Sequence, residues 1–120
     1  MGERPARAII GLDPAALVQE PSNAVWLQSL VTTAEHGPDI SVTWVHIAGH
    51  HRRLRTQRST RVYVLLSGVL QIQLADAPPA PVPEGGVAVV PRGTPYELDG
   101  TATYLVINAP AFVDGDDEYE

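Results

Sequence analysis

The stretch GHHRRLRTQRSTRVYVLLSG, residues 49–68, carries five of the eight arginines of the chain and no acidic residue. Its second half alternates, with Arg61, Tyr63 and Leu65 at every other position and aliphatic residues between them. Successive side chains of a β-strand point to opposite faces, so this pattern predicts a strand with one face in the protein interior. The cationic residues that lead into this strand are the predicted ligand-binding region.

Further strand-like segments lie on both sides of this stretch. They are rich in β-branched and aromatic residues, and Gly, Pro, Asp and Ser separate them at short intervals. No segment has a persuasive 3.6-residue period, so we expect an all-β fold, a closed or nearly closed sandwich. The expected strands are 25–34, 40–48, 61–75 (as two strands joined at Ser67-Gly68), 87–91, 95–98 and 103–108, with turns at Gly93 and Gly100 and a proline-rich loop at 76–86.

The 120 residues suffice for a single domain with one core. We expect an N-terminal arm at 1–22, in which 6–10 pairs as an edge strand and 13–20 forms at most one helical turn. The barrel itself is expected at 23–112. An acidic tail follows at 113–120.

The net charge of −6 is concentrated at the end of the chain, because five acidic residues fall within the last seven positions. Like charges in a run repel one another, so we expect a solvated, disordered tail, with partner binding as the alternative. The rest of the chain is close to neutral. A net-negative protein with few aromatics beside its arginines is not expected to bind nucleic acid.

Two residue types are missing altogether. The chain has no cysteine, which excludes disulfides and thiolate chemistry, and no lysine, which excludes a Schiff base on a side-chain amine. It also has no apolar run of about 18 residues that would span a membrane. The apolar stretch near the start is too short for a signal peptide, and we therefore expect a cytoplasmic protein with no membrane partner.

Two spaced motifs resemble the signature motifs of the cupin family. The first has the form G-x5-H-x-H-x3-4-E-x6-G, and Gly68 closes it at the expected distance. The second has the form G-x5-P-x-G-x2-H-x3-N, and Gly85, Pro91 and Gly93 reproduce its start. The resemblance covers residues 40–108 and implies a single-domain cupin-like β-barrel or jelly roll. It also implies a homodimer formed through the sheets and N-terminal arms.

The positions that hold the metal in that family are substituted here. The motif puts Arg61 at the glutamate position, Arg55 and Gln57 at the first two histidine positions, and Tyr96 at the third. Arginine does not deprotonate in proteins, glutamine is a weak ligand and neutral tyrosine a poor one. A one-residue shift would instead place Leu54 and Thr56 at the first two histidine positions. With either alignment we expect no metal and no cofactor.

The histidines leave one alternative open. His50 and His51 are adjacent, so in an extended strand they point to opposite faces. A turn of the chain would bring His46 towards His50, with His36 or Glu35 as a third ligand, which makes an unusual metal site at His46, His50 or His51 the alternative. The other interpretations of His46 are an inward general acid/base and a hydrogen-bonded core residue.

Without a metal, the inward side chains are expected to form a cationic pocket. Arg61, helped by Arg55, is suited to bidentate recognition of a carboxylate or phosphate. The alternative is an internal ion pair of Arg61 with Glu97 or Asp99. The expected catalytic residues are Tyr96, His46 and Arg61, and the expected substrate-binding residues are Arg55, Gln57, Arg61, Tyr63 and Trp44.

Two functions from different classes fit this pocket. The first is a metal-independent enzyme, of the isomerase, cyclase, dehydratase or decarboxylase type, acting on a small anionic organic substrate. The resemblance implies a place in secondary metabolism for such an enzyme. The alternative is a small-molecule binding or sensory module without chemistry. A purely structural dimeric domain follows if Arg61 is neutralised internally.

Overall fold

The computed structural model describes residues 5–120. Its helical elements are short: two 3-10 turns, η1 (Pro14–Ala16) and η2 (Pro21–Asn23), and the helix α1 (Thr33–His36). No helix in this part of the chain has the length and apolar character needed to cross a membrane. The strands are β1 (Val18–Glu20), β2 (Val25–Val31), β3 (Ser41–Thr56), β4 (Thr60–Leu74), β5 (Ala80–Val82), β6 (Val87–Val90), β7 (Tyr96–Ala109) and β8 (Asp117–Tyr119). The all-β fold predicted from the sequence is confirmed.

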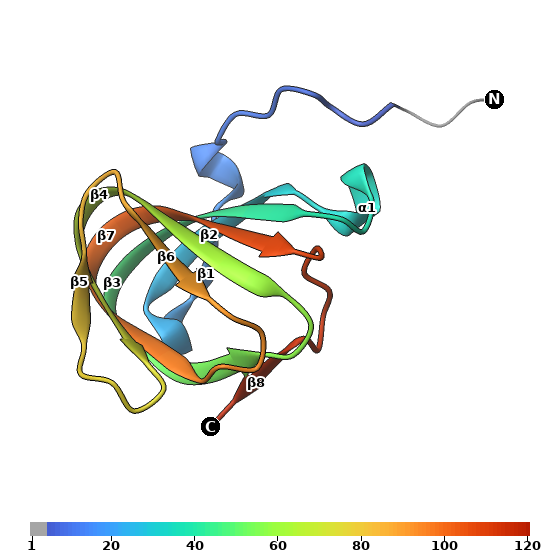
Figure 1. The fold of residues 1–120 in the computed structure, drawn as a ribbon. Helices are drawn as coiled ribbons and strands as arrows, with labels where there is room; N and C mark the ends of the chain where they lie inside the picture. Colours follow the sequence, from blue (N-terminus) through green and yellow to red (C-terminus); the bar gives the residue numbers. More distant parts are fainter. Residues whose placement is uncertain (1–4) are drawn as a thin grey trace.

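The strands form one antiparallel sheet that curls around a common interior (Figure 1). Its order is β1-β2-β3-β7-β4-β5, with β6 added beside β4 and β8 beside the end of β3. The long strands β3, β4 and β7 bend as they pass from one wall of the barrel to the next. As a result β4 pairs with β6 in its first half and with β5 in its second half.

The expected turns at Gly68 and Gly100 are bends inside continuous strands. Gly68 lies within β4 and Gly100 within β7, at the level where these two strands pair. A Cβ on Gly68 would lie 2.3 Å from the carbonyl oxygen of Thr101, and one on Gly100 would lie 2.0 Å from that of Val69. The prediction of two strands joined at Ser67-Gly68 is therefore wrong, because these glycines allow close backbone contact rather than chain reversal.

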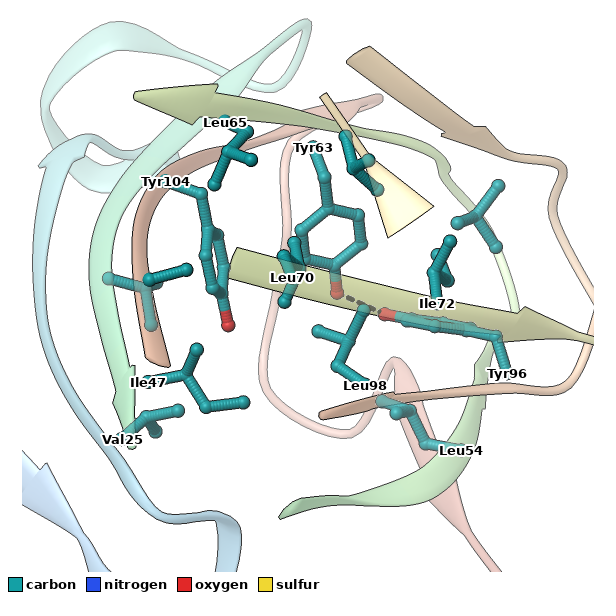
Figure 2. Close-up of a cluster of buried hydrophobic side chains, with 14 residues drawn as sticks. Val25, Ile47, Leu54, Tyr63, Leu65, Leu70, Ile72, Tyr96, Leu98 and Tyr104 are labelled. Carbon is teal, nitrogen blue, oxygen red and sulfur yellow. Dashed lines mark hydrogen bonds between the residues drawn. The ribbon is translucent and has the colours of Figure 1, made fainter. Parts of the chain in front are cut away.

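The inward face of each long strand supplies the core. Arg61, Tyr63 and Leu65 all lie on the buried face of β4, as the alternation predicted, with exposed fractions of 6%, 3% and 0%. Figure 2 shows Tyr63, Tyr96 and Tyr104 among the aliphatic side chains of the interior. A hydrogen bond joins the hydroxyls of Tyr63 and Tyr96.

The N-terminal arm contributes a different edge strand from the one expected. Residues 6–10 form no strand; the Arg7 backbone N–H and guanidinium donate to the carboxylate of Glu35 instead. The edge strand is β1, which the turn η2 folds back onto β2. The strand expected at 25–34 ends earlier, at Val31, because Thr32 caps the short helix α1, and a break precedes β3 as expected.

The C-terminal segment, residues 111–120, is ordered, so the prediction of a disordered tail is wrong. Its strand β8 pairs with the end of β3, at the lower rim of the barrel in Figure 1. The physical reason is charge complementarity: four of the five arginines of residues 49–68 pair with carboxylates of this segment, and the fifth, Arg52, stacks over its tyrosine ring. The pairs are Arg52 with Tyr119, Arg53 with Glu120, Arg55 with Glu118, Arg58 with Asp116, and Arg61 with Asp117.

Candidate active site

A cavity of about 420 Å3 lies inside the barrel, between the first half of β4, the second half of β7, β2, β3 and the C-terminal segment. Its apolar wall includes Val25, Val45 and Val106. Polar groups line the rest of the cavity. This combination of an apolar wall with a few convergent polar groups is typical of small-molecule sites.

Arg61 is the centre of the polar network of the cavity. Its guanidinium donates to the hydroxyl of Tyr96 at 2.8 Å, to Oδ1 of Asn108 at 2.9 Å and to Oδ1 of Asp117 at 2.9 Å. Burial by itself lowers the pKa of Arg61, but its contacts with Tyr96, Tyr63 and Asp117 more than offset this and raise the pKa above the ordinary value. Arg61 is therefore a permanent cation whose counter-charge is Asp117.

The rings of Tyr63, Tyr96 and Tyr104 pack against one another next to this network. The rings of Tyr63 and Tyr96 pack edge to face at 5.8 Å, and those of Tyr63 and Tyr104 at 5.3 Å. Burial raises the pKa of all three phenols, so they stay protonated and act as hydrogen-bond donors. Because Arg61 only donates, the Tyr96 oxygen accepts from it; Tyr96 can then donate to Tyr63 and leave the Tyr63 proton free for the cavity.

His51 supplies the group in the cavity best suited to accept a proton. Its Nδ1 lies 3.0 Å from the carbonyl oxygen of Arg52, and a carbonyl only accepts, so Nδ1 carries the proton and Nε2 is the basic nitrogen. The ring stacks on Tyr119 at 6.2 Å. Desolvation by burial lowers the pKa of His51, which keeps the imidazole neutral at pH 7.

His46 and Trp44 do not lie in the cavity, and their predicted roles there are wrong. In this half of β3 the odd-numbered residues point inward, as Val45 and Ile47 show by exposed fractions of 5% and 0%. His46 lies on the outer face, where its Nδ1 is 3.0 Å from Thr103 Oγ1 and its ring packs against Trp26. Trp44 shares that outer face because it is two residues away on the same strand.

Arg55 and Gln57 also lie outside, contrary to their predicted substrate-binding role. Both side chains bond to Glu118 on the barrel surface. The reason is a bulge in β3 between His51 and Leu54, which shifts the alternation by one residue and turns Leu54 and Thr56 inward. The one-residue shift of the motif is therefore the alignment that the structure adopts.

Of the predicted site residues, the structure brings together Arg61, Tyr63 and Tyr96. Arg61 and Tyr63 line the cavity, and Tyr96 lies behind them in hydrogen-bond contact with both. The expected internal partner of Arg61, Glu97 or Asp99, is wrong: these residues face His50 on the surface, and Asp117 takes that place.

Sequence reasoning missed several groups of the cavity wall, among them His51, Asn108 and Asp117. The inward position of Asn108 could have been predicted from the sequence, because alternation along the strand places it on the same face as Tyr104 and Val106. His51 precedes the bulge and so keeps the inward parity of Val45. The position of Asp117 could not be predicted in this way, because an acidic run at a chain end resembles a solvated tail.

The residues at the metal positions of the cupin motifs do not fit a metal. The inward set is Leu54, Thr56, Arg61 and Tyr96, which offers an aliphatic group, a hydroxyl, a permanent cation and a protonated phenol. Among residues 5–120 no group of three or more His, Asp or Glu side chains is placed to hold a metal ion. The alternative metal site at His46, His50 or His51 has no third ligand in this part of the chain.

The barrel and its motifs define the cupin fold, and solved structures share it. No protein-family profile and no curated protein sequence matches the chain. Pac13 from Streptomyces, described as a nucleoside dehydratase, superposes with a TM-score of 0.80 at 18% identity, over 96% of this chain and 92% of that one. A variant of that protein with glutamine in place of one histidine, solved with uridine, gives 0.81 at 17% identity, over 96% and 92% of the two chains. A protein from Planctomyces limnophilus gives 0.79 at 22% identity, over 94% and 96%.

Proposed function

We propose that the protein is a metal-independent lyase that removes water from a small hydroxylated organic compound bound in the barrel cavity. The observation that carries the proposal is that one cavity is lined both by a neutral His51, whose Nδ1 carries the proton, and by the phenol of Tyr63, which is connected through Tyr96 to the Arg61 cation. A base and a charge-stabilising donor in one apolar cavity are what an elimination requires.

In the proposed reaction, His51 Nε2 takes a proton from a carbon next to a carbonyl group. Negative charge then develops on the carbonyl oxygen, where the Tyr63 hydroxyl stabilises it by hydrogen bonding. The neighbouring C–O bond breaks, and the departing hydroxide takes the proton back from the imidazolium and leaves as water. The step balances without an external reductant or cofactor.

One comparison supports this assignment over other lyase or isomerase chemistry, and the cavity volume agrees with the size of the proposed ligand. The fold neighbour Pac13 is described as a nucleoside dehydratase, and variants of it with one histidine or one tyrosine replaced were solved with uridine. The cavity volume of about 420 Å3 falls in the range of roughly 300–1,000 Å3 for small-molecule sites and admits a ligand of nucleoside size.

The test is a mass-spectrometric screen for water loss from nucleosides and hydroxylated carbonyl compounds. The wild type should convert at least one compound, and His51→Gln should reduce turnover roughly 100-fold or more, the usual contribution of a general base. His46→Gln, which changes a histidine on the outer face of the same strand, is the matched control and should retain full activity. Equal loss in both variants would contradict the assignment of His51.

A binding or sensory module without chemistry is the second candidate, because the cavity combines an apolar wall with polar groups. Asp117 neutralises Arg61, the condition set for a purely structural domain, but the cavity beside this pair favours a ligand-binding role. A binding module needs no proton-transfer group, so it does not account for the basic Nε2 of His51 or for the lowered pKa of this residue. The same screen separates the two functions. Ligand binding without turnover, with equal affinity in the wild type and His51→Gln, would favour the binding module.

We further propose that two copies associate through the outer sheet face. There, aligned residues of β3, β7, β4 and β6 form two apolar rows. Val87 and Val89 at the ends of these rows are 57% and 52% exposed. Contiguous apolar surface of this kind is typical of protein interfaces. The rows are Val42, Ile107, Val62 and Val89, and Trp44, Leu105, Val64 and Val87.

A further inference from the structure

The five contacts between arginines and the C-terminal segment are not equivalent. Four of them involve arginines that lie outside the cavity. Three of these arginines pair with carboxylates that also lie outside it, namely Asp116, Glu118 and Glu120, and the fourth, Arg52, stacks over Tyr119 of the cavity wall. Only the Arg61–Asp117 pair has both members in the cavity wall. The side chain of Arg61 is 7% exposed and that of Asp117 is 20% exposed, so water screens this pair less than the others.

Asp117 is held firmly in place opposite Arg61. Its Oδ1 accepts from Arg61 Nη2 at 2.9 Å and from Thr56 Oγ1 at 2.7 Å, and its Oδ2 lies 3.4 Å from Arg61 Nη1. This two-point geometry is the one with which arginine recognises a bound carboxylate or phosphate. Asp117 therefore occupies the position in which an anionic group of a ligand would sit.

The charges in the cavity wall also disfavour an anionic ligand. Arg61 and Asp117 cancel, His51 is neutral at pH 7, and Glu20 adds a further carboxylate to the wall. An anion entering the cavity would lose hydration and meet a net negative wall with no unpaired cation. An uncharged ligand avoids the repulsion and loses much less hydration free energy than an anion.

One side-chain amide in the cavity wall, that of Asn108, could donate a hydrogen bond to an uncharged ligand. Nδ2 of Asn108 is buried and has no hydrogen-bond partner among residues 5–120. The orientation of this amide is fixed, because Arg61 Nε donates to Oδ1 and a flipped amide would set two donors against each other. A carbonyl oxygen is an uncharged acceptor that would satisfy such a donor.

We infer that Asp117 determines the substrate class: it masks Arg61 and restricts the cavity to uncharged, oxygen-bearing ligands, such as a nucleoside rather than a nucleotide. This inference differs from the expectation of an anionic substrate. The inference rests on the proposed cavity site, but it concerns binding and does not depend on the dehydration chemistry. It follows that removing the negative charge of Asp117 should leave Arg61 free to bind an anion.

The test uses inorganic phosphate as the anionic probe, with thermal unfolding and isothermal titration calorimetry as readouts. Phosphate should not stabilise the wild type. Asp117→Asn, which keeps the side-chain shape and an acceptor for Thr56, should bind phosphate at least roughly tenfold more tightly than the wild type, as expected for a new charge-assisted contact. Glu118→Gln removes the same charge from the same strand outside the cavity and should behave as the wild type.

Each other result overturns the inference. Phosphate binding by the wild type would show that Asp117 does not mask Arg61. No gain in Asp117→Asn, or an equal gain in Glu118→Gln, would show that Arg61 is not the anion site. If Asp117→Asn does not fold, Asp117→Ser provides the same comparison. An inactive His51→Gln enzyme, or a failed screen for water loss, would count against the proposed reaction only.

The matched pair uridine and uridine 5′-monophosphate tests the ligand class directly. Of the two, the wild type should bind uridine more tightly, and Asp117→Asn should shift the preference towards the monophosphate. A wild-type preference for the monophosphate would overturn the inference.

Discussion

His51 illustrates how one backbone contact can determine the chemistry of a side chain. The Arg52 carbonyl oxygen fixes the proton on Nδ1, and burial makes the charged ring unfavourable. Both effects leave Nε2 as a base at neutral pH. Neither effect is visible in the pair of adjacent histidines in the sequence.

We predict that the acid limb of the pH–rate profile reports His51. Because its pKa in the folded protein lies below the usual value of about 6.5, kcat/KM should be constant at neutral pH and fall only when the pH drops below that value. The same shift makes the folded state bind fewer protons than the unfolded state, so stability should also decline as the pH falls below about 6.5. A kcat/KM that falls between pH 8 and pH 7 on acidification would contradict the lowered pKa.

Of the three buried tyrosines, Tyr96 is predicted to contribute most to stability through its hydroxyl group. Tyr96→Phe removes an acceptor from Arg61 and a partner from Tyr63, and should lower the free energy of unfolding by about 1–3 kcal/mol in urea titrations. Tyr104→Phe is the control, since no hydrogen bond to the Tyr104 hydroxyl is found among the described residues. Equal losses in both variants would mean that the hydrogen bonds of Tyr96 contribute no stability of their own.

At the scale of single residues, alternation predicted the inward positions of Arg61 and Tyr63 correctly. Motif spacing, by contrast, placed Arg55 and Gln57 inward in its first alignment, and this failed because a bulge adds a residue to β3 and turns Leu54 and Thr56 inward instead. A bulge has no signature in this sequence, since neither glycine nor proline lies between His51 and Leu54.

Among the strands, β8 shows why a charge pattern must be considered together with its partner. The acidic run of the C-terminal segment and the arginine run of residues 49–68 were each visible in the sequence, but their pairing depends on the register of β3 with β8. Only the folded sheet brings these two stretches together.

We predict that Asp116 anchors this segment. Its carboxylate accepts from Arg58 through both oxygens and from the backbone N–H of Val113, and the hydrogen bond from Arg58 is the main reason why its pKa is lowered. Asp116→Asn should lower the free energy of unfolding at pH 7 by about 1–2 kcal/mol.

The pH dependence of that loss has a definite sign. A carboxyl whose pKa is lowered by folding stabilises the protein above its unfolded pKa of about 3.9, and this contribution is lost as the pH falls through the folded pKa. The difference between the wild type and Asp116→Asn should therefore be full at pH 7 and shrink below about pH 4. A difference that does not depend on pH would show that the lowered pKa of Asp116 is not its source.

At the scale of the whole molecule, the class of fold was predictable and the content of the cavity was not. Of the motif glycines, Gly68 allows a close backbone contact, whereas Gly85 and Gly93 adopt a positive φ of 76° in turns. These are requirements of the barrel backbone and do not depend on which residues stand at the metal positions. The polar groups of the cavity come from five strands and the C-terminal segment, and their convergence is a product of the closed sheet.

The outer sheet face makes a prediction about assembly. In light scattering the protein should have about twice its chain mass of 12.9 kDa. Val89→Glu places a charge in the apolar rows and should shift the protein towards the monomer. Val69→Glu alters an exposed valine beyond the bend at Gly68 and should leave the mass unchanged. A monomeric wild type would refute the proposed interface.

The placement of the aromatic residues separates the optical signals of this molecule. Trp26 and Trp44 belong to the outer faces of β2 and β3, whereas Tyr63, Tyr96 and Tyr104 lie inside the barrel. Tryptophan emission therefore reports events at the exterior, such as association, and near-ultraviolet tyrosine dichroism reports the interior, such as ligand entry. One unlabelled sample can thus distinguish filling of the barrel from contact between copies.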